Sequence, residues 1–187
     1  MNEPGYLTNQ LLIAMPGMQD PNFSTTVTLI CEHNTDGALG IIINRPLSLN
    51  LGGLLEQLEV TAPDSAIRTR PVLDGGPVAK ERGFVLHQPG GRFESSVAVS
   101  SDIQLTLSRD VLDALACGEG PSKSLVALGY AGWEAGQLEA EMLENTWLSV
   151  PATPELIFDV PFEDRWQSAA NSLGIELSRL SIDAGHA

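Results

Sequence analysis

Residues 11–46, LLIAMPGMQDPNFSTTVTLICEHNTDGALGIIINRP, decide the fold around which the remaining chain must pack. Two apolar runs, residues 27–32 and 38–43, flank a polar link that ends in Asp36-Gly37. Asp-Gly favours the positive φ angles of a tight turn, so these runs predict a β-hairpin. The apolar run 11–14, which stops at a Pro-Gly pair, predicts a further strand before the hairpin.

The hairpin carries the clearest candidate site. Cys31 and His33 are two residues apart, so a regular strand places the thiol and the imidazole on one face. Arg45 follows Asn44 at the end of the return strand. Its positive charge would favour the thiolate form of Cys31, and its guanidinium could hold an anion. The alternative is structural, because Cys31 also shares a face with Leu29 and would then be a small core residue. In that case His33 only caps the turn.

Glycine-rich turns and a basic segment add candidate ligand-binding residues. Gly75 and Gly76 precede a proline and form either a nest of backbone amides for an anion or an ordinary turn. Residues 68–92 hold five basic side chains against two acidic ones, which makes this segment the best candidate for an anion-attracting surface. The complete set of ligand-binding candidates is Asn44, Arg45, Gly75, Gly76, Arg82, His87 and Trp133.

Composition limits the classes of partner. The 187 residues include 10 Lys and Arg against 24 Asp and Glu, a net charge of −14. Such a chain repels a phosphate backbone, so direct nucleic-acid binding is disfavoured. Residues 124–164 contain eight of the acids and no Lys or Arg, which is typical of a solvated acidic face. The length and the 43% hydrophobic content predict one domain spanning residues 1–187.

Cysteine and histidine usage predicts a cytoplasmic protein without a metal or another cofactor. The two cysteines do not form a CxxC pair, and His33, His87 and His186 are scattered along the chain. The N-terminus lacks the pattern of a signal peptide, and the apolar runs are too short to span a bilayer. We therefore expect free thiols and no membrane contact.

The order of the expected elements predicts the fold class. It is not a regular βα alternation, and it predicts an α+β protein with a mostly antiparallel, strongly curved sheet and helices packed outside it. The elements expected after the hairpin are helices at 51–58, 109–117, 135–144 and 161–173, and strands at 71–78, 83–87, 97–100, 104–107, 124–129 and 146–150.

Four segments in this order resemble the YqgE/AlgH family of bacterial proteins. They are residues 12–23, residues 31–34 with 40–46, residues 75–77 with 82–87, and residues 129–133 with 136–139 and 145–147. The resemblance implies a bifurcated sheet curled into a pseudo-barrel. It implies no particular reaction, because the family lacks an established biochemical activity. The AlgH name reflects a proposed role in regulating alginate production.

Three functional hypotheses follow. The first is a non-enzymatic cytoplasmic binding or regulatory protein, with a cleft near the hairpin for a small anion or a protein segment; the sequence has no nucleophile elbow, P-loop, dinucleotide fingerprint or metal set. The second is a thiol-based enzyme or redox sensor that uses Cys31 with His33 as its base. The third is a transcription-linked regulator that acts indirectly or through the basic segment 68–92. The sequence does not predict an oligomeric state.

Overall fold

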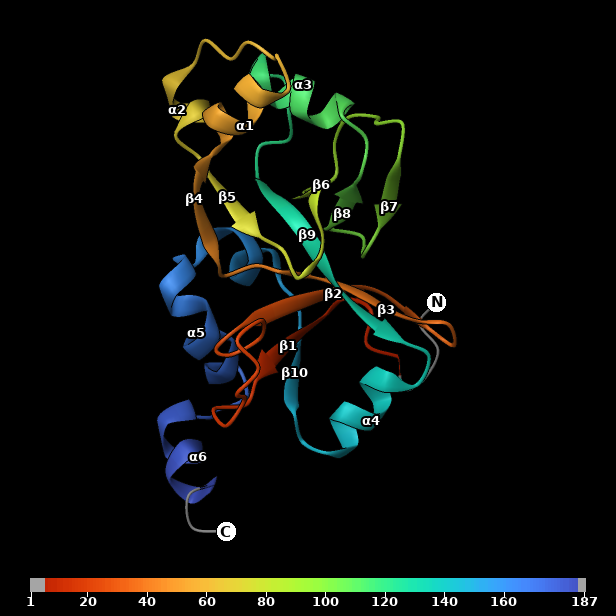
Figure 1. Ribbon diagram of the computed structural model, residues 1–187, viewed down its shortest axis with the longest axis vertical. Helices are drawn as coiled ribbons and strands as arrows, with labels where there is room; N and C mark the ends of the chain where they lie inside the picture. The colour runs from red at the N-terminus through yellow and green to blue at the C-terminus, as the bar shows by residue number, and fades with distance from the viewer. Residues whose placement is uncertain (1–5, 185–187) are drawn as a thin grey trace.

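The computed structural model describes residues 6–184, so His186 lies outside the described part of the chain. Within that part, ten strands form one sheet system in the order β10-β1-β2-β3-β9-β6-β8-β7, with β4 and β5 attached beside β9 (Figure 1). The strands are β1 (Gln10–Ala14), β2 (Val27–Asn34), β3 (Gly37–Ile42), β4 (Pro46–Asn50), β5 (Pro71–Asp74), β6 (Val78–His87), β7 (Ser96–Ala98), β8 (Gln104–Thr106), β9 (Ser124–Glu134) and β10 (Trp147–Pro151).

Helices surround this sheet. In Figure 1, α1, α2 and α3 lie at the upper end, α4 lies below the β2–β3 hairpin, and α5 and α6 lie on the left. The helices are α1 (Leu51–Gln57), α2 (Ser65–Arg68), α3 (Asp110–Ala116), α4 (Gln137–Leu143), a π-helix (Glu155–Asp159), a 3-10 turn (Phe162–Asp164), α5 (Arg165–Asn171) and α6 (Leu177–Ala184).

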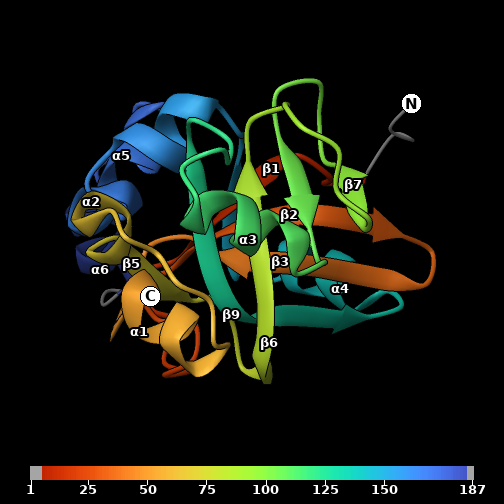
Figure 2. The ribbon, with the colours of Figure 1, turned by 90° about the horizontal axis from the view of Figure 1, so that it is seen from above.

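Strand β9 belongs to both halves of the sheet. Its first residues pair with β5 in parallel and with β6 in antiparallel, whereas residues 131–134 pair with β3. The other strand pairs among residues 6–184 are antiparallel. The sheet therefore divides at β9 and curls into a half-barrel, as the two views show (Figures 1 and 2). The predicted class, α+β with a curved, mostly antiparallel sheet and helices outside, is confirmed.

Glycines allow the two halves to cross. Gly76 has a φ of +152°, and a Cβ on it would lie 2.1 Å from the carbonyl carbon of Tyr130. Gly129 has a φ of +81°, and a Cβ there would lie 2.4 Å from the Gly76 oxygen. Only glycine provides both the backbone conformation and the space at such a contact. Gly129 therefore marks a crossing point within β9, not the strand end that the sequence predicted.

Other boundaries also differ from the prediction. Two elements, α2 and the π-helix, are not among those that the sequence predicted. Pro46 begins β4, which pairs with β5 at the edge of the sheet, a position where proline is tolerated. Asn50 caps α1, because its side chain accepts a hydrogen bond from Gly53 N at 2.9 Å.

The lower half of the sheet is buried on both faces. Alternate residues of β1 and β2, such as Ile13 and Leu29, point into the largest apolar cluster, whereas Leu12 and Ile30 point into a separate cluster beneath α4. A further cluster lies under α1 and α3 at the other end of the molecule. None of the helices within residues 6–184 is long and apolar enough to cross a membrane.

Candidate functional site

A β-bulge at Cys31 decides what the hairpin can do. In the β2–β3 ladder Ile30 lies opposite Gly40 and Glu32 lies opposite Leu39, which leaves Cys31 as an extra residue. A bulge of this kind reverses the alternation of side chains beyond it. Cys31 stays in the large apolar cluster, whereas His33 turns to the face covered by α4. The expectation that the two side chains share a face is therefore wrong.

The Cys31 thiol is a core group. Its residue is 3% exposed, and its Sγ lies 3.7 Å from the Leu29 carbonyl oxygen. Burial raises the pKa of the Cys31 thiol far above its ordinary value, and the negative charge of Glu32 raises it further. The structure therefore places Cys31 with Leu29, as in the structural alternative, and gives the hypothesis of a reactive Cys31–His33 pair no geometric support.

Alkylation distinguishes the two cysteines. In the folded protein, iodoacetamide is expected to modify exposed Cys117 and to leave Cys31 unmodified, because a buried thiol with a raised pKa provides almost no thiolate. Mass spectrometry should show one adduct before and two after unfolding in guanidinium chloride. A Cys117→Ser variant provides the control and should remain unmodified while folded. Native Cys31 reacting as fast as Cys117 would contradict the assignment.

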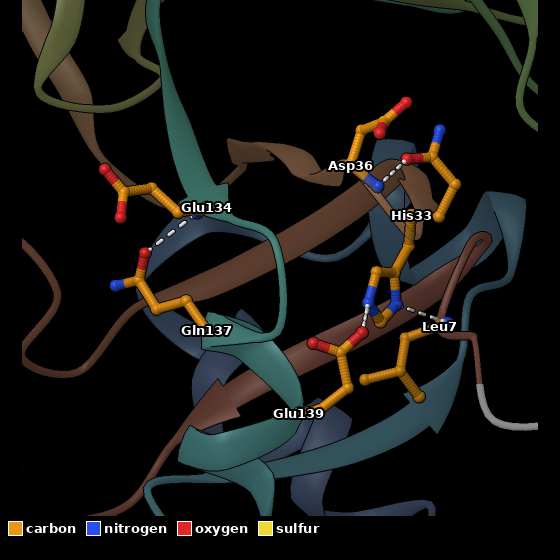
Figure 3. A network of polar contacts seen from close by, with 7 residues as sticks. Leu7, His33, Asp36, Glu134, Gln137 and Glu139 are labelled. Carbon is orange, nitrogen blue, oxygen red and sulfur yellow. Dashed lines mark hydrogen bonds and ion pairs between the residues drawn. The ribbon is translucent and has the colours of Figure 1, made fainter.

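Both ring nitrogens of His33 are engaged (Figure 3). Leu7 N donates to Nδ1 at 3.0 Å, so the ring proton resides on Nε2, which donates to Glu139 Oε1 at 2.5 Å. The pKa of Glu139 is lowered, first by a hydrogen bond from its own backbone N–H and further by His33. The histidine therefore ties the N-terminal segment and β2 to α4, and it has no nitrogen left to act as a base.

Asn44 and Arg45 stabilise the turn before β2. Asn44 accepts a hydrogen bond from Val27 N and donates one to Thr25 O, both at 2.9 Å. The Arg45 guanidinium donates to the carbonyl oxygens of residues 22 and 24 at 2.7 and 2.8 Å. Backbone carbonyl oxygens of its own chain therefore hold the Arg45 guanidinium, which the sequence predicted to hold an anion.

The other candidates from the middle of the chain have internal partners as well. Gly75 N donates to Leu128 O at 2.8 Å and Gly76 N donates to Asp74 Oδ1 at 3.2 Å, so these amides do not form an open anion nest. His87 is fully buried, with Nε2 2.6 Å from the Thr106 hydroxyl. Its Nδ1 lies 2.8 Å from the carbonyl oxygen of the next residue. Arg82 is exposed and lies over the Phe84 ring.

Trp133 packs beneath the sheet. Its indole N–H and that of Trp147 both donate to Glu141 Oε1, at 3.2 and 3.1 Å, and the Phe23 ring lies against both indoles. This cluster holds α4 on the sheet. Trp133 also borders a groove on the opposite face of the sheet ends, although its ring is part of the core under α4.

A groove of about 610 Å³ lies over the outer ends of β2, β3 and β9. Glu32, Leu39 and Gly132 lie opposite one another in the ladders and form one row across its floor. Gly132 contributes no side chain to this row, which helps to keep the floor hollow. The lining residues are Glu32, Asn34, Asp36, Gly37, Ala38, Leu39, Val78, Tyr130, Gly132, Trp133 and Glu134.

The groove is acidic. Glu32, Asp36 and Glu134 are exposed at its lining, and none of the three forms an ion pair with any residue from 6 to 180. Figure 3 shows Asp36 and Glu134 on the upper side of the hairpin, opposite His33 and its partner on α4. Within the described chain, no group of three or more His, Cys, Asp or Glu residues is arranged to hold a metal ion. The charge therefore favours a cationic group in this groove rather than an anion.

Sequence reasoning did not identify these carboxylates as a site. In the sequence, Glu134 is one of the eight acids of residues 124–164, and no pattern assigns a role to Glu32. The strand register could have located them. If β9 extends beyond Gly129, Glu134 lies opposite Gly37 in β3, and Gly37 lies opposite Asn34 in β2. Without that extension, the sequence gives no reason to place Glu134 beside the hairpin.

The curled, bifurcated sheet with an acidic groove at its outer end defines a class, the small α+β half-barrel proteins. The chain belongs to the AlgH-like family, whose model matches residues 11–178. This confirms the family resemblance that the sequence segments indicated. No specific biochemical function is established for the family.

Known relatives cover nearly the whole chain. A UPF0301 protein of Thioalkalivibrio sulfidiphilus is 53% identical over 187 residues and covers 100% of both chains. A UPF0301 protein of Nitrosococcus oceani is 52% identical over 182 residues, 97% of each chain. The solution structure of AlgH from Pseudomonas aeruginosa is 49% identical, covers 97% of this chain and 96% of its own, and superposes with a TM-score of 0.81. A crystal structure from Corynebacterium diphtheriae, 19% identical with a TM-score of 0.72, shares the fold and covers 96% of this chain and 93% of its own.

Proposed function

We propose that this chain is a non-catalytic cytoplasmic binding protein whose acidic groove receives a basic, extended segment of a partner protein. The observation that carries the proposal is a set of three carboxylates around one open hollow, Glu32, Asp36 and Glu134, which form no ion pair with residues 6–180. Glu32 accepts one long hydrogen bond, from Asn34 Nδ2 at 3.5 Å. Carboxylates without a cationic partner are available to a ligand, and they steer cations toward the site.

The apolar lining supports a peptide over a simple cation. Leu39, Val78 and Tyr130 lie between the carboxylates, and Val78 is 39% exposed. An extended segment that alternates Lys or Arg with apolar residues would place positive charges at the rim and apolar side chains on this floor. The segment would lie across the ends of the strands.

The chemistry of the surrounding groups supports binding without turnover. The two groups that could act as nucleophile and base, Cys31 and His33, are a core thiol and a bridging imidazole. Both cysteines are free thiols, the state expected in a reducing compartment, which supports the cytoplasmic part of the proposal.

Gly132 provides a test that leaves the charge unchanged. A Cβ at Gly132 would meet only the Tyr130 ring, at 3.3 Å, so valine should be accepted in the strand while its side chain fills the floor of the groove. A fluorescein-labelled peptide of alternating Lys and Val is the probe. Gly132→Val should weaken its binding about tenfold or more in fluorescence anisotropy, a loss of roughly 1.4 kcal/mol or more.

The matched control is Gly83→Val, because Gly83 is also a strand glycine and a Cβ there would meet no atom within 4 Å. It does not line the groove, and the affinity for the peptide should remain that of the wild type. Equal binding by both variants would mean that the peptide associates only with the general negative charge of the chain, and the proposal would fail. A peptide with Glu in place of Lys should not bind either variant.

A further inference from the structure

A second hollow lies at the other end of β9, where that strand begins. Its volume is about 250 Å³, smaller than the roughly 300–1,000 Å³ typical of pockets for drug-sized ligands. The π-helix and the 3-10 turn that precede α5, light blue in Figure 2, lie beside the start of β9. The lining residues are Leu51, Arg70, Pro71, Ser122, Lys123, Ser124, Leu125, Val126, Phe158 and Phe162, none of which lines the acidic groove.

Arg70 is the central polar group of this pocket. The side chain is half-buried, and its contact is a hydrogen bond from Nη1 to the Ser124 hydroxyl at 3.3 Å. Its backbone is fixed, because its N–H donates to Ile67 O at 3.2 Å and its carbonyl oxygen accepts from Leu51 N at 2.8 Å. Arg70 pairs with no carboxylate among residues 6–180, in contrast to Arg68, which pairs with Glu56.

The surrounding charges permit an anion to enter. Lys123, which lines the pocket, forms an ion pair with Asp159, so these two charges offset each other beside the pocket. Ser124 accepts its hydrogen bond from Arg70 and can donate its own proton to a ligand. The other N–H donors of the Arg70 side chain have no partner among residues 6–180, and a planar guanidinium binds a carboxylate or a phosphate through two parallel hydrogen bonds.

Apart from Ser122 and Lys123, the remaining lining residues are apolar. Phe158 and Phe162 come from the segment before α5, Leu51 begins α1, and Leu125 and Val126 belong to β9. From this combination we infer that the pocket binds a small metabolite that joins one oxyanion, a carboxylate or a phosphate, to a flat apolar body. The oxyanion lies on Arg70 and Ser124, and the body lies against the two phenylalanines. This site does not depend on the function proposed for the acidic groove.

Ligand titrations with matched probes test the inference. Phenyl phosphate and phenylacetate carry the two possible oxyanions, benzyl alcohol carries the same body without charge, and inorganic phosphate carries the charge without the body. At least one of the first two should raise the melting temperature of the wild-type protein and shift the amide signals of Ser124 and Leu125 in NMR spectra. Benzyl alcohol and inorganic phosphate should bind at least about tenfold more weakly, since each lacks half of the contacts.

Two arginine variants locate the site. Arg70→Gln should lower the affinity for the better probe about tenfold or more, whereas Arg92→Gln, the same charge change at an exposed position outside the pocket, should leave it unchanged. Arg70→Lys keeps the positive charge but lacks the planar pair of guanidinium donors, so its affinity for the probe should be intermediate. This variant replaces Arg70→Gln in the comparison if the glutamine variant does not fold. The inference is overturned if neither oxyanion probe binds, or if Arg70→Gln and Arg92→Gln bind equally well.

Discussion

Replacing Gly76 by alanine is expected to remove most of the folding free energy of this protein. The backbone at Gly76 adopts a φ of +152°, which costs an L-residue about 1–3 kcal/mol. The added Cβ would also lie 2.1 Å from the Tyr130 carbonyl carbon and 2.4 Å from Ala131 N. Because those atoms are backbone of the strand shared by both halves of the sheet, they cannot move without disturbing the strand pairing. We expect a total loss of at least about 4 kcal/mol.

Gly90 provides a matched control. Its φ is +151°, almost the same as at Gly76, but a Cβ there would meet no atom within 4 Å. Gly90→Ala should therefore carry only the conformational cost of about 1–3 kcal/mol. Urea denaturation followed by circular dichroism measures both variants, and the difference between them isolates the contact with β9. Equal destabilisation of the two variants would contradict the close contact between Gly76 and the backbone of Tyr130 in β9.

The local parts of the fold could be predicted from the sequence. The hairpin of β2 and β3 follows from the turn at Asp36-Gly37, and α4 follows from its amphipathic spacing. The full length of β9 could not be predicted. Glycine usually weakens a strand, and a reader of the sequence cannot know that Gly129 faces another glycine from a distant segment. The division of the sheet depends on that non-local contact.

The candidate site was harder to predict than the fold because face assignment depends on every residue between two positions. One extra residue at Cys31 reverses the direction of His33, and the sequence contains no signal for the bulge. The other polar candidates failed for a different reason. Asn44, Arg45 and His87 have the right chemistry for ligand binding, but their donors and acceptors are used by neighbouring groups of the chain. A sequence shows which groups can form hydrogen bonds and not which of them remain free.

Arg165 is an internal support that the sequence did not reveal, and its loss should have the second-largest effect. The residue is 2% exposed, its Nη1 donates to Ile43 O at 2.5 Å and its Nε donates to Val160 O at 2.8 Å. The guanidinium carbon lies 4.4 Å from the centre of the Phe162 ring. Burial lowers the pKa of Arg165 to about 10 and the nearby Asp159 opposes that change, so the side chain remains charged at neutral pH.

Arg165→Met preserves much of the apolar stem but leaves the carbonyl oxygens of Ile43 and Val160 without their donor. An unsatisfied buried acceptor costs about 1–3 kcal/mol, and removal of the desolvated charge offsets part of that cost, so we expect a net loss of roughly 3 kcal/mol. Arg179→Met is the control, because Arg179 is 81% exposed and should change stability by no more than about 0.5 kcal/mol. The midpoints of urea denaturation, compared at a constant m-value, give the change in unfolding free energy for both variants. A loss for Arg165→Met no larger than that for Arg179→Met would mean that water or a backbone shift satisfies the two carbonyls, and that α5 is held on the sheet by its apolar face alone.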